Sequence, residues 1–243
     1  MRKVVFIVIL LLILIVSLFI YRNITDYLAM NNNATESTEQ VSSYPERPAI
    51  QIKPGDSLYI RLLKAEDKLE LWATSDGKTY NLYKTYIICT YSGGLGPKKI
   101  QGDKKSPEGF YSTNKRLLNP NSQYHLSFNI GYPNAFDKAN GYTGDFLMVH
   151  GGCASAGCYA MTDPIITEIY RLVEQALDSG QKSIPIHIFP FAMTQENMKN
   201  HLESKDFAFW LTLKPAYDYF EQTQQVPQVV VENKMYKVIG YQG

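Results

Sequence analysis

Cysteine and histidine are scarce in this chain, whose 243 residues include only 3 cysteines and 4 histidines. Neither sign of charge is in clear excess, because 24 basic residues nearly balance 23 acidic ones. No long basic run occurs. Without a surplus of positive charge there is no electrostatic basis for holding a polyanion, so nucleic acid is excluded as an expected partner. No internal repeat is present, which excludes a solenoid or propeller.

The longest apolar run lies at the start of the chain. It extends from Val4 to Tyr21 with Ser17 as its one interruption, close to the ~20 residues that a helix needs to cross a bilayer. A cleaved signal peptide is the alternative, but its apolar region normally has ~7–15 residues and ends at a small-x-small site, which this run lacks. We therefore predict that residues 1–22 form an uncleaved anchor, a single pass through the cytoplasmic membrane. Arg2 and Lys3 would stay inside and the rest of the chain outside.

The remaining chain divides by composition. Residues 23–54 are polar, contain three prolines and have too few large apolar side chains to fold alone, so they are predicted to be a flexible linker. A folded domain is predicted over residues 55–225. Residues 226–243 are predicted to be a C-terminal extension packed on that domain, with one last strand over Gln228 to Tyr241.

The folded part alternates short strand-like runs with a few helical ones. Asp76-Gly77 predicts a two-residue hairpin turn, and the apolar spacing after Asp163, with Pro164 behind it, predicts a helix that Asp163 caps and Gly180 ends. A β-dominated α+β domain follows from this alternation. Strands are expected over residues 58–63, 69–74, 79–91, 110–111, 124–130, 146–149 and 184–189, and a second helix over 195–209 with an aromatic-rich segment to Phe220.

The stretch over residues 145–163 contains the candidate chemistry. An apolar run ends on His150 and continues into a loop of Gly, Ala, Ser and Cys. The thiolate of Cys158 would be a strong nucleophile, and an imidazole within reach can take its proton and return it to a leaving amine. Gly157 allows a backbone conformation that a Cβ would penalise, so the N–H groups of Gly157, Cys158 and Tyr159 could together hold an oxyanion. The pattern predicts an acyl-transfer site.

These residues also allow other interpretations. An isolated cysteine or histidine is usually a structural residue. His150, Cys153 and Cys158 could supply three zinc ligands, but the order His-x2-Cys-x4-Cys fits no common zinc spacing and a fourth ligand would have to come from far away. A zinc site is therefore not expected, and the acyl transfer described above needs no metal or organic cofactor. The other histidines are assigned structural positions in strands (His125, His187) or a surface position (His201).

Three cysteines outside a membrane cannot all form pairs. Cys89 lies in an apolar strand and is expected to be an unpaired core residue. The sequence does not choose among three roles for Cys153: packing in the loop, forming a disulfide that masks Cys158, or shaping the substrate site.

The segment Ser155-Ala156-Gly157-Cys158-Tyr159-Ala160-Met161 resembles the Ser/Thr-x-Gly-Cys nucleophile motif of the L,D-transpeptidases, the YkuD-type catalytic domain, with His150 as the upstream histidine. The short gap between the two residues is similar to the YafK-like branch, and the resemblance covers roughly residues 57 to 220. The chain departs from the pattern at Ala160 and at Ala192, where the family typically or often has arginine. Further segments that resemble the branch are residues 92–99, 102–111, 131–134 and 189–191.

The resemblance implies a YkuD-like mixed β-sandwich and a membrane-anchored enzyme of the bacterial envelope, acting on the periplasmic or outer side. It implies that Cys158 attacks the carbonyl of the diaminoacid at the third position of a peptidoglycan stem peptide, releases D-alanine or another amine, and forms a thioester. His150 would be the base, and Ser155 would orient the loop or the imidazole.

Three outcomes of that chemistry remain open from the sequence. An amine acceptor gives transpeptidation, whereas water gives a hydrolase using the same site, either an L,D-carboxypeptidase or an amidase that releases an envelope protein linked to peptidoglycan. From a different class, the domain could be a non-catalytic peptidoglycan-binding module.

Overall fold

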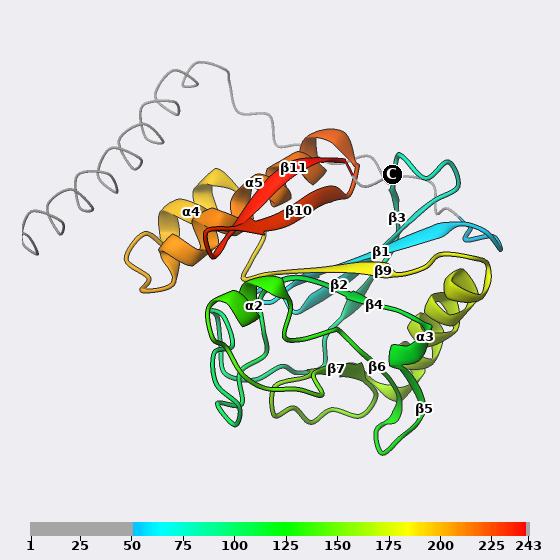
Figure 1. The fold of residues 1–243 in the computed structure, drawn as a ribbon. Helices are drawn as coiled ribbons and strands as arrows, with labels where there is room; N and C mark the ends of the chain where they lie inside the picture. Colours follow the sequence, from blue (N-terminus) through cyan, green and yellow to red (C-terminus); the bar gives the residue numbers. More distant parts are fainter. Residues whose placement is uncertain (1–50, 242–243) are drawn as a thin grey trace, which may run out of the picture. The chain divides into compact units, whose positions relative to one another are not determined.

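The computed structural model describes residues 51–241 (Figure 1). The predicted anchor, residues 1–22, and nearly all of the predicted linker lie outside the described residues. Within residues 51–241, no helix is long and apolar enough to cross a membrane.

A five-stranded sheet forms the middle of the described part, with strand order β3-β2-β1-β9-β4. The neighbours in this sheet are antiparallel except β1 and β9, which run parallel. Its strands are β1 (Ser57–Leu63), β2 (Lys68–Thr74), β3 (Asn81–Ile87), β4 (Gly109–Thr113) and β9 (Ile184–Phe189). All five were predicted, although β3 is shorter than expected and the β2–β3 connection uses residues 75–80 instead of two residues.

Alternation along β1 shows why the sheet is buried on both faces. Leu58, Ile60 and Leu62 point into one apolar cluster, while Tyr59 and Leu63 belong to clusters on the opposite face. Successive side chains of a strand point to opposite faces, so a strand that is apolar throughout needs a layer on each side. Figure 1 shows these layers, with α5 and the β10–β11 hairpin on one side and β6 and β7 on the other.

A four-stranded sheet, order β5-β6-β7-β8, covers the first face together with helix α3 (Asp163–Asp178). Its strands β7 and β8 run parallel. The strands are β5 (Leu118–Ser122), β6 (His125–Asn129), β7 (Met148–His150) and β8 (Tyr159–Ala160), and the short helix α2 (Ala135–Ala139) and 3-10 turn η1 (Lys115–Leu117) lie in the connections. The apolar stripe predicted α3 correctly, but β5 and α2 were not predicted.

The cap of α3 differs from the prediction. Thr162 is the N-cap residue, and it makes no side-chain cap hydrogen bond. The carboxylate of Asp163 instead accepts the N–H of Gly152 at 2.7 Å. Asp163 therefore connects the start of the helix to the candidate site loop. A local capping pattern does not reveal this hydrogen bond.

The second face is covered by α4 (Gln195–Asn200), α5 (Phe207–Thr223) and a hairpin of β10 (Pro227–Glu232) and β11 (Met235–Tyr241). One helix over residues 195–209 was expected, but the chain breaks after Asn200 and restarts at Phe207. A single last strand was also expected. The C-terminal segment instead turns at Asn233 and Lys234, both with positive φ (50° and 63°), which is the backbone of a two-residue hairpin turn. The architecture is a sheet-dominated α+β fold, as predicted.

Candidate active site

The parallel pairing of β7 and β8 brings the predicted nucleophile and base together. His150 is paired with Ala160, and Cys158 comes directly before β8. The N–H of Met148 points at Sγ of Cys158 at 3.4 Å. Both predicted residues line one cavity of about 500 Å³. Its lining comprises Asn119, Ser122, Gln123, Tyr124, Ser127, Phe146, Met148, His150 and Cys158.

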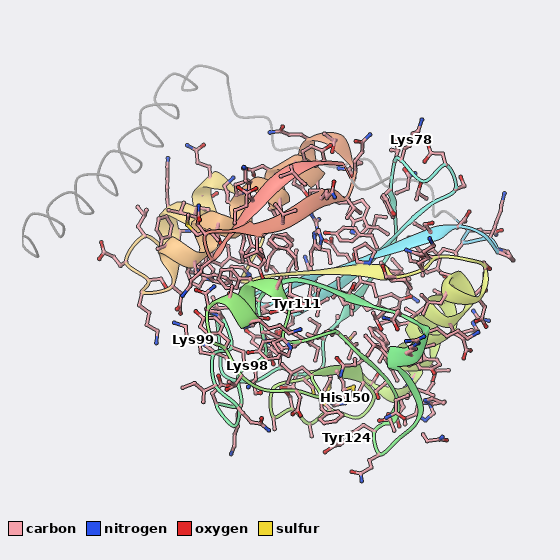
Figure 2. All side chains as sticks on the ribbon, viewed as in Figure 1. Lys78, Lys98, Lys99, Tyr111, Tyr124 and His150 are labelled. Atoms are coloured by element: carbon pink, nitrogen blue, oxygen red, sulfur yellow. A yellow bond between two sulfur atoms is a disulfide. The ribbon has the colours of Figure 1, made fainter. Side chains whose placement is uncertain are left out.

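The imidazole of His150 is held by its Nδ1 atom. Nδ1 lies 2.6 Å from the carbonyl oxygen of Gly151, and because a carbonyl can only accept, Nδ1 carries the hydrogen. Nε2 of the neutral ring is then the atom able to take a proton. The ring is buried and stacks on Tyr124, with centroids 4.7 Å apart (Figure 2).

Cys158 has a partly accessible thiol. Burial raises the pKa of this thiol above its ordinary value, and the N–H of Met148 and the positive charge of Lys98 oppose that shift less strongly. Burial therefore favours the protonated thiol over the thiolate in the resting protein. Because the thiolate is the attacking species, a reaction at Cys158 depends on a base that removes this proton.

The backbone carbonyl of Cys158 is held by two serine hydroxyls. Ser155 Oγ donates to it at 2.7 Å and Ser106 Oγ at 2.9 Å. Ser155 thus orients the nucleophile loop, and no contact between Ser155 and the imidazole is found in the described part of the chain. Ser106 was not singled out from the sequence as a site residue, because it lies 52 positions earlier and only the fold brings it here.

Two of the predicted oxyanion donors have other roles in this geometry. The N–H of Gly157, which has φ +124°, points at Ser155 Oγ at 3.3 Å. The ring of Tyr159 is fully buried, its hydroxyl donates to the carbonyl of Pro107 at 2.6 Å, and its backbone belongs to β8. Of the three predicted donors, the N–H of Cys158 is the one to which no other hydrogen bond is assigned within residues 51–241.

A buried ion pair supports residues 93–109, a glycine-rich segment that contains Ser106. Lys64 Nζ lies 3.0 Å from Glu108, with both side chains fully buried, and also donates to the carbonyl of Ser106 at 2.9 Å. Glu108 in turn accepts the N–H of Gly96 at 2.6 Å and Nε1 of Trp210 at 2.8 Å. Every charge in this cluster is hydrogen-bonded, which is what makes burying it tolerable. Sequence reasoning missed this support, since its members are scattered along the chain.

The cysteine predictions need correction. Cys89 is bonded to Cys153, with Cα atoms 5.5 Å apart and a separation of 64 positions in the sequence. The expectations of an unpaired Cys89 and of a Cys153 that packs freely or masks Cys158 are wrong. The reason is that the chain beyond β3 runs beside the site, where the N–H of Cys89 donates to the carbonyl of Ala160 at 2.8 Å. Cys158 is a free thiol.

This pairing also removes Cys153 from the set of three zinc ligands considered above. Across residues 51–241, no cluster of three or more His, Cys, Asp or Glu side chains is placed to hold a metal ion.

The other histidines lie away from the cavity. His187, in β9, is buried, and burial lowers its pKa to about 3. His125 has its Nε2 2.8 Å from the hydroxyl of Thr167. His201, predicted to be a surface residue, is half-buried and stacks on Phe191, with ring centroids 4.1 Å apart. None of the three lines the cavity with Cys158.

Residues 59–188 match the sequence model of the YkuD family, described as the L,D-transpeptidase catalytic domain. The chain belongs to the L,D-transpeptidase family. It is 52% identical over 184 residues to the Escherichia coli (strain K12) protein named L,D-transpeptidase YafK, a name that assigns the activity provisionally; the match covers 76% of this chain and 74% of the relative. The YafK-like branch is thereby confirmed.

Solved structures with a similar arrangement were also found. The K307A mutant of the helical cell shape determining protein Pgp2 from Campylobacter jejuni has 24% identity and a TM-score of 0.46, covering 67% of this chain and 56% of that chain. Bd1075 from Bdellovibrio bacteriovorus has 17% identity and a TM-score of 0.39, covering 74% and 82% respectively.

The two departures from the family pattern have distinct positions. Ala160, where the family typically has arginine, is fully buried in β8, and its N–H donates to the carbonyl of Thr90 at 2.9 Å. Ala192 lies in the other apolar cluster, against the second face of the central sheet. Neither position offers a cation for a substrate carboxylate.

Proposed function

We propose that this protein is a cysteine-dependent acyltransferase that acts on peptidoglycan stem peptides. The observation that carries the proposal is the placement of a free thiol, Cys158, and an imidazole anchored through Nδ1, His150, in one cavity of an L,D-transpeptidase-family domain. The family supplies the substrate class. The cavity supplies a nucleophile, a base and room for a peptide.

The reaction would begin from a neutral thiol and a neutral imidazole. Nε2 of His150 takes the thiol proton while Sγ of Cys158 bonds to the carbonyl carbon of the diaminoacid at the third stem position. The N–H of Cys158 would donate to the developing oxyanion. The imidazolium then gives its proton to the leaving amine, D-alanine or another amine, as the carbon–nitrogen bond breaks and a thioester remains.

The thioester is resolved by the reverse sequence. An incoming amine, from a neighbouring stem peptide or from an envelope protein, attacks the thioester carbonyl and loses a proton to His150. The thiolate of Cys158 leaves and recovers that proton. If water takes the place of the amine, the same steps give hydrolysis. Ser155 and Ser106, which hold the Cys158 carbonyl, keep the nucleophile loop in place during both halves.

Digestion of peptidoglycan with the purified protein, followed by mass analysis of the muropeptides, tests the proposal. New cross-links at the third residue are the expected result. Shortened stems indicate a carboxypeptidase, and a released peptidoglycan-linked protein indicates an amidase. Material that is bound but unchanged would overturn the enzyme assignment in favour of a binding module. Cys158→Ala is the matched control, since it removes only the sulfur.

We further propose that residues 1–22 anchor the protein in the cytoplasmic membrane with the folded part on the periplasmic side, where peptidoglycan lies. The apolar run from Val4 to Tyr21 supports this. N-terminal sequencing of protein purified from membranes should find the residues of the run retained. A mature N-terminus near residue 30 would show a cleaved signal instead.

A further inference from the structure

We propose that Tyr124 is a positioning residue for His150, an inference that rests on the proposed function. The two rings are stacked, with centroids 4.7 Å apart and planes 28° from parallel. Figure 2 shows the two labelled residues close together below the central sheet. Both also line the cavity that contains Cys158.

The imidazole needs a second constraint besides its hydrogen bond. The bond from Nδ1 to the carbonyl of Gly151 fixes one edge of the ring but leaves the plane free to tilt about the bond. A ring stacked on one face of His150 limits that tilt. Nε2 is then aimed in one direction, which is what proton transfer from Cys158 requires. The face of the phenol ring also favours the imidazolium that forms when the proton is taken.

Tyr124 is itself held in place from three sides. Its carbonyl oxygen accepts the N–H of Gly151 at 3.0 Å. Its own N–H donates to the hydroxyl of Ser122 at 3.1 Å. The next residue, His125, is tied to Thr167 of α3. The turn between β5 and β6 is thus hydrogen-bonded to both the site loop and helix α3, and these bonds restrain the backbone that carries the stacked ring.

The aromatic face of Tyr124 is the part that matters for this role. The side chain is 48% exposed, so it contributes little to the core. Within residues 51–241 its hydroxyl makes no hydrogen bond. Phenylalanine should therefore do the same work, whereas an aliphatic residue of similar reach should not. This separates positioning by the ring from a general contribution to folding.

The test compares Tyr124→Phe, Tyr124→Leu and His150→Ala, with Phe146→Leu as a matched control. Phe146 is the other exposed aromatic residue of the cavity (71% exposed), and it has no stacking contact with His150. Two quantities are measured: kcat and KM on a tetrapeptide muropeptide, and the rate at which iodoacetamide alkylates Cys158 at neutral pH. The second readout needs no natural substrate.

Tyr124→Phe is expected to stay within about twofold of wild type in both readouts. Tyr124→Leu is expected to lose ~10–10²-fold in kcat with little change in KM, as a misaligned catalytic group does, and to slow alkylation toward the rate of His150→Ala. Phe146→Leu should alter KM without the fall in alkylation rate that is expected of Tyr124→Leu. Thermal unfolding should show similar midpoints for Tyr124→Phe, Tyr124→Leu and Phe146→Leu, whereas His150→Ala truncates a buried ring and should unfold at a lower temperature. Tyr124→Met serves as a second variant should Tyr124→Leu fold poorly.

Wild-type alkylation and turnover in Tyr124→Leu would overturn the inference, as would an equal loss in Tyr124→Phe, which would point to the hydroxyl. Failure of the proposed function looks different. In that case wild type turns over no muropeptide, while the alkylation rates still report whether Tyr124 acts on the pair of His150 and Cys158.

Discussion

Cys153 lies between His150 and Cys158 in the sequence, and its sulfur is bonded to that of Cys89 beyond strand β3. The loop that carries the proposed nucleophile is therefore tied to the edge of the central sheet. A bond at this place restrains the loop without consuming the reactive thiol, since Cys158 stays free. Its role is then to hold the site.

Removal of this disulfide should destabilise the protein and slow the reaction. In the chain-entropy model, a link that closes a loop of about 64 residues contributes ~4 kcal/mol to the free energy of unfolding. Cys89→Ser, Cys153→Ser and the double variant should each lose up to this amount in urea unfolding and retain reduced activity. Reductant should weaken wild type and leave the double variant unchanged. Activation by reductant would instead indicate a disulfide that masks Cys158.

Gly151→Ala should damage the site without an effect on backbone strain. A Cβ there would lie 2.6 Å from Oδ1 of Asp163 and 2.7 Å from the carbonyl oxygen of Tyr124, contacts too short to keep. The expected loss is about 1–3 kcal/mol in unfolding free energy, with a clear fall in turnover. Gly180→Ala is the control, because Gly180 has φ +109° but open space around it. It should cost stability alone, and equal turnover in both variants would contradict this account.

Breaking the buried pair of Lys64 and Glu108 should be strongly destabilising. Lys64→Met leaves the carboxylate of Glu108 buried without its cation, and such losses amount to roughly 3–5 kcal/mol. Lys115→Met is the control, since Lys115 pairs with Asp178 at the surface and should change nothing measurable. Chemical unfolding of both variants decides the point, and a stable Lys64→Met protein would show that the cluster is dispensable.

The strands of the central sheet and α3 could be predicted because their signals are local. Alternating or continuous apolar runs, such as Leu58 to Leu63, need only a neighbouring strand to bury them. The prediction of one helix over residues 195–209 was wrong because tertiary packing divides this segment. Its two halves pack in one apolar cluster as separate helices, with a break before Phe207 that no strong turn signal marks. The segment expected as one last strand is a hairpin because Asn233 and Lys234 adopt positive φ. Asparagine is often found with positive φ, but a lysine in the sequence does not indicate such a turn.

The candidate site was predictable only as far as its residues lie close together in sequence. His150 and Cys158 are eight positions apart, and the parallel β7–β8 pairing brings them to one cavity. Ser106 and Cys89 reach the same place from other segments, through contacts that only the folded chain defines. Composition and spacing have no means of signalling such contacts.

The raised thiol pKa of Cys158 leads to a prediction about pH. Burial favours the protonated thiol, so its folded pKa lies above the ordinary value of 9.0. In His150→Ala, where no base assists, alkylation of Cys158 by iodoacetamide should be slow at neutral pH and should keep rising as the pH passes 9. Wild type should already react at neutral pH. A plateau below pH 8 in His150→Ala would mean that the thiolate forms without His150.

The central claim is that Cys158 carries the acyl group. Intact-mass measurement after brief incubation with a purified tetrapeptide muropeptide should show wild type heavier by the muropeptide less D-alanine. Peptide mapping should place the adduct on Cys158. His150→Ala should accumulate it more slowly, in line with the ~10²–10⁴-fold that a general base contributes. Cys158→Ala should remain at its native mass while staying folded. An adduct on another residue, or full turnover of muropeptides by Cys158→Ala, would contradict the account.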